Sequence, residues 1–248
     1  MDRIRDFPCV PAAVALALSL LAPSEGWAHR QPQSSEQGAY RHGAASRDGI
    51  GRFYMGREIS QVMGHRGAEW LERPGRQREE RTDLLVERLP LQNDDVVADI
   101  GAGTGFFTFP MAARVPGGEV IAVDIQREML DIVERRKREL EVDNVRTLLG
   151  TPRDPGLPAG TVDLILIVDA YHEFSHPREM GQALFRSLKS GGKLVLVEYR
   201  AEDPTVPIKR LHKMSQAQAK KEMHAVGFQW LKTERFLPQQ HVLIFARP

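Results

Sequence analysis

A glycine-rich loop, Gly101-Ala102-Gly103-Thr104-Gly105, constrains the fold of this 248-residue chain more than any other feature. The loop directly follows a predicted strand and precedes a helical run. Glycine permits tight turns with positive φ, and its missing side chain lets a ligand approach the backbone closely. The sequence therefore predicts a strand–turn–helix unit with a ligand bound at the loop.

Two acidic residues narrow down the kind of ligand. Asp99 precedes the loop, where a carboxylate would repel a pyrophosphate and attract an ammonium group, and Phe106 replaces the third glycine of the dinucleotide fingerprint. Asp124 ends the next predicted strand, where a carboxylate can accept hydrogen bonds from both hydroxyls of a ribose. The alternative is that both acids only cap the ends of their strands.

The rest of the chain alternates between strand-like and helix-like patterns, which predicts a mostly parallel sheet covered by helices on both faces. The predicted strands are Val96–Ile100, Glu119–Val123, Val145–Leu149, Asp163–Val168, Lys193–Glu198, Phe228–Arg235 and His241–Ala246. The predicted helices are Glu128–Leu140, Arg178–Lys189 and Gln216–Val226. The short connection at Pro238 predicts that the last two strands form an antiparallel pair at the edge of the sheet.

The predicted domain covers residues 52–248 and begins with a cap, residues 52–90, made of two helices. Helical spacing of apolar residues places these helices at Glu58–Glu72 and Gln77–Arg88. Residues 29–51 are rich in Gln, Ser, Gly, Ala and Arg, a composition typical of a flexible linker.

Residues 1–28 have the pattern of a secretory signal peptide: two arginines, an apolar run and small residues before a cleavage site at Ala28. An uncleaved anchor is the alternative, but the apolar run Val10–Ala22 is shorter than the ~20 residues that span a bilayer. We therefore expect export, to the periplasm, with no stable membrane insertion after cleavage, and a cytoplasmic protein if the leader is not used. The single cysteine, Cys9, lies in this leader, so the processed chain would have no thiol nucleophile.

The segments DIGAGTG, VIAVDIQ, VDLILIVDAYHEF and LKSGGKLVLVEYR together resemble the class I S-adenosylmethionine-dependent methyltransferases. The resemblance implies a Rossmann-like, doubly wound α/β fold with a mostly parallel seven-stranded sheet, strand order 3-2-1-4-5-7-6 and strand 7 antiparallel. It implies S-adenosylmethionine as the cofactor. It assigns the methionine part to Asp99, Gly101, Ala102, Gly103 and Gly105, the ribose to Asp124, the adenine to Ile125 and the surroundings of the sulfonium to Asp169.

One position departs from the pattern of this family. Many relatives carry an acid after the third strand that contacts the adenine amino group, and Thr151 occupies its place here. The hydroxyl of Thr151 or the displaced carboxylate of Asp154 could make this contact.

The segment His172-Glu173-Phe174-Ser175-His176 matches the H-E-x-x-H motif of zinc hydrolases. Pro177 disfavours a helical conformation at His176, so a loop at a strand end is the preferred interpretation, and no metal site is predicted. His172 then becomes the candidate general base, with Tyr171 as a second catalytic candidate and Glu173 as a weaker one. The alternative is that His172 only hydrogen-bonds the loop backbone.

The predicted function is methyl transfer to the oxygen or nitrogen of a small molecule. The near-neutral net charge of +1 gives no field that would attract nucleic acid. In the cap, Tyr54, Arg57, His65 and Trp70 either face the substrate or pack inward, with inward packing favoured for Trp70. A non-catalytic S-adenosylmethionine-fold binding protein and a zinc hydrolase using HEFSH are the alternative functions.

Overall fold

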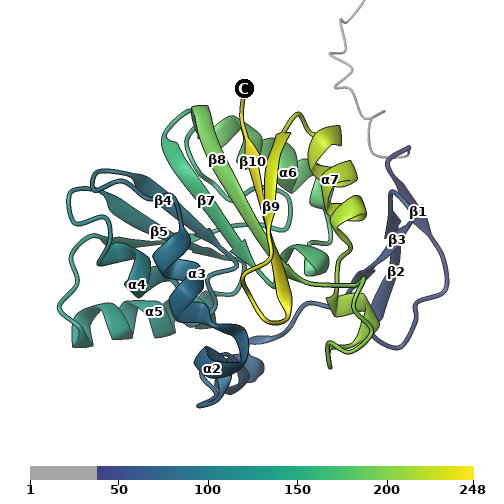
Figure 1. Cartoon of the computed structure of the whole chain (residues 1–248), viewed down its shortest axis with the longest axis horizontal. Coiled ribbons are helices and arrows are strands. Elements are labelled where there is room, and N and C mark those ends of the chain that lie inside the picture. The colour runs from purple at the N-terminus through teal and green to yellow at the C-terminus, as the bar shows by residue number, and fades with distance from the viewer. Residues whose placement is uncertain (1–37) are drawn as a thin grey trace, which may run out of the picture. The chain divides into compact units, whose positions relative to one another are not determined.

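The computed structural model describes residues 38–248. The predicted leader, residues 1–28, and the first part of the predicted linker lie outside the described residues. The described residues belong to one compact unit, built on a seven-stranded sheet (Figure 1).

The strand order of the large sheet is β6-β5-β4-β7-β8-β10-β9, which confirms the predicted order 3-2-1-4-5-7-6. β10 runs antiparallel to both of its neighbours, β8 and β9, as predicted for strand 7, and the other strand pairs of this sheet are parallel. The strands are β4 (Val96–Ile100), β5 (Glu119–Asp124), β6 (Val145–Leu149), β7 (Val162–Val168), β8 (Leu188–Tyr199), β9 (Gln229–Glu234) and β10 (Gln240–Ala246).

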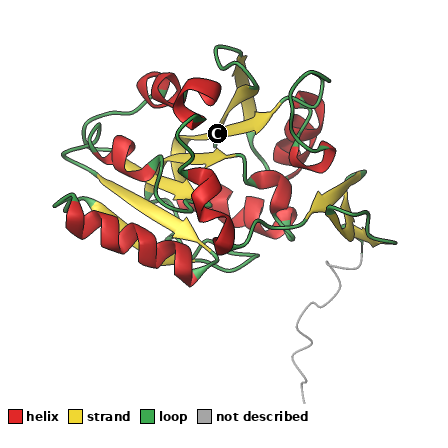
Figure 2. Ribbon diagram, turned by 90° about the horizontal axis from the view of Figure 1, so that it is seen from below, coloured by secondary structure: helices red, strands yellow, loops and turns green. Residues whose placement is uncertain are grey.

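Helices cover both faces of this sheet (Figure 2). Alternate residues of the central strands point to opposite faces, so Val97 packs on one side and Ala98 on the other. The first face packs against α3 (Thr82–Arg88), α4 (Thr108–Ala112) and α5 (Arg127–Glu139), and the second against α6 (Pro177–Ser187) and α7 (Gln216–Ala225). Among the described residues, no helix is both long and apolar enough to cross a membrane.

The N-terminal part of the unit differs from the predicted linker and cap. Strands β1 (Tyr40–His42), β2 (Gly49–Tyr54) and β3 (Arg57–Ser60) form a three-stranded antiparallel sheet. Tyr40, Tyr54 and Ile59 are buried together in it, so these few apolar residues suffice to order a segment whose composition is otherwise that of a linker. The flexible linker predicted for 29–51 is therefore wrong over the strand residues Tyr40–His42 and from Gly49 onward.

The helix predicted for Glu58–Glu72 is also wrong. Its first residues belong to β3, and only η1 (His65–Gly67) and α1 (Ala68–Leu71) are helical. The second cap helix is divided in two, α2 (Arg76–Glu80) and α3, because Arg81 adopts a left-handed conformation with φ of 53°. These breaks leave a short, irregular cap in place of two regular helices.

Candidate functional site

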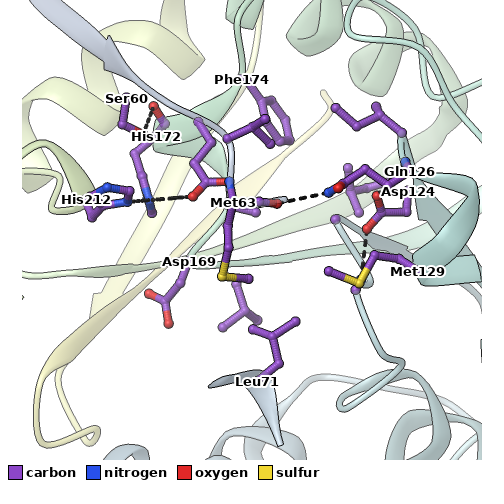
Figure 3. A pocket seen from close by; sticks show the side chains of 18 of the residues that line it. Ser60, Met63, Leu71, Asp124, Gln126, Met129, Asp169, His172, Phe174 and His212 are labelled. Carbon is purple, nitrogen blue, oxygen red and sulfur yellow. Dashed lines mark hydrogen bonds and ion pairs between the residues drawn. The ribbon is translucent and has the colours of Figure 1, made fainter. Parts of the chain in front are cut away.

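A cavity of about 730 Å³ lies at the carboxyl ends of β4, β5 and β7, where ligands bind in open α/β sheets (Figure 3). Its walls come from the strand-end loops of the large sheet and from the cap. In Figure 3, Asp124 and Gln126 lie on one side of the pocket, and His172 and His212 lie on the other.

The glycine loop forms part of the first side. Gly101, Gly103 and Gly105 have φ of 74°, 54° and 81°, values that L side chains rarely adopt. Gly101 and Gly103 line the cavity, whereas Ala102 and Gly105 do not. A Cβ atom at Gly105 would lie 2.8 Å from the ring of Phe109, so this glycine serves the packing of α4.

Asp124 lies at the end of β5 and lines the cavity. Its Oδ2 accepts a hydrogen bond from the backbone N–H of Gly103 at 2.9 Å, and its Oδ1 accepts one from the N–H of Gln126 at 2.9 Å. Burial raises the pKa of Asp124, and these backbone donors oppose the rise. The carboxylate thus ties the glycine loop to the start of α5 at the position predicted to hold a ribose.

Asp99 does not line the cavity, although the sequence predicts it there. Its side chain is buried, and its Oδ2 accepts a hydrogen bond from the hydroxyl of Thr108 at 2.6 Å. Burial raises the pKa of Asp99, and the hydrogen bond from Thr108 lowers it by a smaller amount, so the pKa is about 6. Asp99 therefore links β4 to the first turn of α4 beneath the loop.

The predicted adenine side contains Ile125, which is 41% exposed, and Thr151, and both line the cavity. The hydroxyl of Thr151 hydrogen-bonds the backbone of Asp154, while Oδ1 of Asp154 accepts from the N–H of Gly156 at 2.8 Å. Asp154 itself does not line the cavity. Of the two residues considered for the adenine contact, only Thr151 is in position.

His172 occupies the second side, in η2 (Tyr171–Glu173) after β7. Its Nδ1 lies 2.7 Å from Oε2 of the fully buried Glu198, and Oε1 of Glu198 accepts from the backbone N–H of His172 at 3.2 Å. Burial lowers the pKa of His172, but the charge and hydrogen bond of Glu198 and the charges of Glu173 and Asp169 together outweigh burial, so the net pKa is raised. With Nδ1 donating a hydrogen bond to Glu198, Nε2 carries the lone pair of the neutral ring, and it lies 3.1 Å from Nδ1 of His212.

Tyr171, the second catalytic candidate, does not reach the cavity. Its ring is 1% exposed, and its hydroxyl donates to Oε2 of Glu222 at 2.9 Å. Burial, together with the charge of Glu222, raises the pKa of Tyr171 well above its usual value. Tyr171 is thus a core residue, as its position in an apolar cluster beside Phe174 also shows.

Asp169 lines the cavity at the end of β7, in a left-handed conformation with φ of 49°. Its Oδ2 accepts from Gln240 at 3.2 Å, and its Oδ1 is buried without a hydrogen-bond partner among the described residues. Burial raises the pKa of Asp169, and the charges of Glu80 and Glu198 raise it further. An unpartnered acceptor at this point suits a ligand that brings its own donor.

The second histidine of HEFSH turns away from the cavity. His176 precedes the first turn of α6, and its Nε2 lies 2.8 Å from Nη1 of Arg52. His172 and His176 are therefore not presented on one helix, so the HEFSH zinc site considered from sequence does not form.

The four cap residues have different surroundings. Tyr54 is buried in the small sheet, Arg57 pairs with Glu222 and donates to the carbonyl of His172 at 3.1 Å, and His65 does not line the cavity. Trp70 is 54% exposed and lines the cavity, so the prediction that it packs inward is wrong.

Sequence reasoning missed Glu198 and His212. Glu198 had a detectable signal, because a carboxylate inside the apolar run of a buried strand needs a partner. His212 in η3 (Arg210–His212) belongs to no motif, and only the fold brings its Nδ1 within 3.1 Å of Nε2 of His172.

Comparison with known proteins agrees with this geometry. Residues 97–192 match a family model described as a methyltransferase domain. An uncharacterized methyltransferase-like protein of Schizosaccharomyces pombe is 32% identical over 150 residues, which are 60% of this chain and 56% of the relative. Demethylmenaquinone methyltransferase of Thermus thermophilus is 32% identical over 124 residues, 50% of this chain and 54% of the relative. The chain thus spans about half the length of the curated relatives it matches.

The crystal structure of a SAM-dependent methyltransferase from Aquifex aeolicus is similar in fold, with a TM-score of 0.71 at 21% identity. The match covers 75% of this chain and 100% of that one. The family model, the curated relatives and the strand order agree with one another. Residues 97–192 thus match a methyltransferase domain, and the seven-stranded sheet that they help to build has the fold of the Aquifex aeolicus SAM-dependent methyltransferase.

Proposed function

We propose that the protein is an enzyme that transfers a methyl group from S-adenosylmethionine to a small-molecule acceptor. One observation carries the proposal: a single cavity joins Asp124 and the glycine loop, on one side, to the His172–Glu198 pair on the other. Cofactor-binding and proton-accepting groups therefore face the same space, which methyl transfer to a protonated nucleophile requires.

The described residues fit this cofactor. Bare backbone lines the cavity at Gly101 and Gly103, and Asp124 is held at the sheet edge by two backbone donors. Oδ1 of Asp169 is a buried acceptor without a partner among the described residues, so a ligand with an ammonium group would satisfy it. When bound, S-adenosylmethionine supplies an electrophilic methyl group.

The chain's own residues then orient the acceptor and receive its proton. Glu198 fixes the ring of His172 and holds the Nδ1 proton, so that Nε2 is the atom able to accept a proton from a hydroxyl or amine in the cavity. Arg57 and Ser60 hold the carbonyl of His172 at 3.1 and 3.3 Å and fix η2 from the cap side. Leu71 and Trp70 of the cap line the same space, where they would help to exclude water once a ligand is bound.

Calorimetric titration with S-adenosylmethionine tests the cofactor site. We expect micromolar binding that Asp124→Ala weakens at least about 10-fold, because one or more charge-assisted hydrogen bonds are lost. Asp154→Ala is the matched control, since this acid lies near the same sheet edge without lining the cavity. Absence of binding to the unmodified protein would refute the proposed function, and binding without turnover would favour the non-catalytic alternative.

Export is also a proposal, supported by the pattern of residues 1–28 in the sequence. Mass spectrometry of the N-terminus of the native protein tests it. A start at His29 would support export, and a start at Met1 would refute it.

A further inference from the structure

Three potential ligand atoms converge on one wall of the cavity. Nε2 of His172, Oε1 of Glu173 and Nδ1 of His212 all lie within 4.8 Å of one another. The two imidazole nitrogens are 3.1 Å apart, and Oε1 of Glu173 lies 3.8 Å from His172 and 3.6 Å from His212. His172 and Glu173 lie in η2, whereas His212 lies in η3, 40 residues after His172 in the sequence.

The size of this triangle suits a single metal ion. Two ligand atoms that are each about 2.1 Å from one ion lie about 3.0 Å apart at a right angle and about 3.4 Å apart at the tetrahedral angle. The observed separations of 3.1, 3.6 and 3.8 Å need only a few tenths of an ångström of contraction. Glu173 and His212, which are 13% and 25% exposed, are the side chains that would make this shift, because His172 is 3% exposed and is held by Glu198.

The surroundings of two of the ligands select the atoms that face the cavity. Glu198 accepts a hydrogen bond from Nδ1 of His172, so that Nε2 carries the lone pair of the neutral ring. A carboxylate behind a ligating histidine is the usual support of a metal site. The backbone N–H of Met63 donates to Oε2 of Glu173 at 3.0 Å and leaves Oε1 for the ion. These supports are separate from the ligand cluster itself.

The local charge favours a cation. Glu173 and Glu198 each contact His172, and Asp169 adds a third carboxyl group on the same wall. The basic side chains near the site are engaged elsewhere, since Arg57 is paired with Glu222 and Lys209 with Asp48. An ion at this point would balance the negative charge of Glu173 and Glu198.

We propose that His172, Glu173 and His212 bind one divalent transition-metal ion. Two imidazoles and one carboxylate favour zinc, iron, cobalt or manganese over calcium and magnesium, and three protein ligands leave coordination positions open to the cavity. With the ion bound, Nε2 of His172 is a ligand and does not accept a proton, and the ion would instead lower the pKa of an acceptor hydroxyl group that occupies an open position. The acceptor class would then be a metal-chelating hydroxyl compound. This role of the ion rests on the proposed function, whereas metal binding itself does not.

Zinc binding to the chelator-treated full chain tests the proposal. We expect calorimetry to show one Zn²⁺ per chain, and Co²⁺ to give the visible absorption bands of a protein-bound ion. His212→Ala should weaken zinc binding at least about 100-fold, and Glu198→Gln about 10- to 100-fold through the lost support of His172. Glu173→Gln should weaken it as well, because the amide is a poor ligand for these ions.

His176→Ala and His224→Ala are the matched controls. The first removes the other histidine of HEFSH, and the second removes an exposed histidine from α7, so neither should change zinc affinity. Absence of saturable binding, or binding that His212→Ala leaves intact, would overturn the proposal and leave a histidine pair that is only hydrogen-bonded. Thermal unfolding checks that each variant folds. Titration of the same samples with S-adenosylmethionine separates failure of the metal site from failure of the proposed function.

Discussion

At the scale of single residues, Asp99 shows how a recognisable motif can mislead about contact. The motif predicts that the acid before the glycine loop holds the cofactor, but its carboxylate binds Thr108 and is 3% exposed. Its pKa of about 6 lies above that of an exposed aspartate, because burial penalises the charged form. The folded protein therefore binds a proton at Asp99 more tightly than the unfolded chain does.

We expect Asp99→Asn to stabilise the protein near pH 7. Between about pH 4 and pH 6 the wild-type folded state retains a proton that the unfolded state has lost, so stability falls as pH rises through this window. The rise of the Asp99 pKa from 3.8 to about 6 lowers the free energy of unfolding at pH 7 by at most about 3 kcal/mol. The neutral amide of Asn would recover this loss. Urea unfolding at pH 4, 5, 6 and 7 measures this difference.

The same variant also tests the role of Asp99 in binding. If Asp99 only supports α4, Asp99→Asn keeps the affinity for S-adenosylmethionine within a few-fold of wild type. A large loss of affinity with unchanged stability would restore the direct contact expected from the family pattern.

At the scale of elements, sequence patterns predict the strands and helices of the large sheet well and the cap poorly. A strand such as β7, with an apolar run bounded by polar turns, is buried on both faces, so its composition alone identifies it. In the cap, Val62 and Trp70 have helical spacing but are 51% and 54% exposed and line the cavity. Apolar residues that serve a ligand site cannot be told from core residues by their periodicity.

The residues of the site likewise include some that the sequence predicts and one that it does not. Seven residues that the sequence assigns to the ligand site do line the cavity, because each follows or ends a strand that the pattern identifies: Gly101, Gly103, Asp124, Ile125, Thr151, Asp169 and His172. No sequence pattern indicates His212, since its approach to His172 depends on a loop path that no local pattern encodes.

The hairpin between β2 and β3 offers a test of the revised cap. Phe53 pairs with Glu58 and Tyr54 with Arg57, so Met55 and Gly56 form a two-residue turn with φ of 48° and 105°. Turns of this kind need positive φ at both positions, which is why glycine is favoured. Gly56→Ala should cost about 1 kcal/mol, since no atom lies within 4 Å of the added Cβ and only backbone strain remains.

Gly64→Ala is the control for this substitution. A Cβ atom added to Gly64 would also have no atom within 4 Å, but the φ of −69° at this residue is accessible to any side chain. Its stability should therefore stay within about 0.5 kcal/mol of wild type. Equal effects of the two variants in chemical unfolding would argue against the hairpin.

At the scale of the whole described unit, the cavity is shared between the cap and the large sheet. Trp70 and Leu71 come from α1, whereas Asp124 and Asp169 come from the ends of β5 and β7. A Cβ atom added to Gly103 would lie 2.7 Å from Leu71, so the cap packs directly on the glycine loop. A ligand in the cavity must therefore contact both parts, and binding should change the environment of the exposed cap residues.

Trp70 can report this change by its fluorescence. The guanidinium of Arg73 lies over its ring, 4.0 Å from the centroid, and the residue is 54% exposed in the cavity wall. We expect saturating S-adenosylmethionine to shift the tryptophan emission, because the ligand displaces water from this ring. Trp70→Phe should abolish the shift, whereas Trp230→Phe should preserve it, since Trp230 lies in β9 and does not line the cavity. A shift that survives Trp70→Phe would show that the cap does not take part in binding.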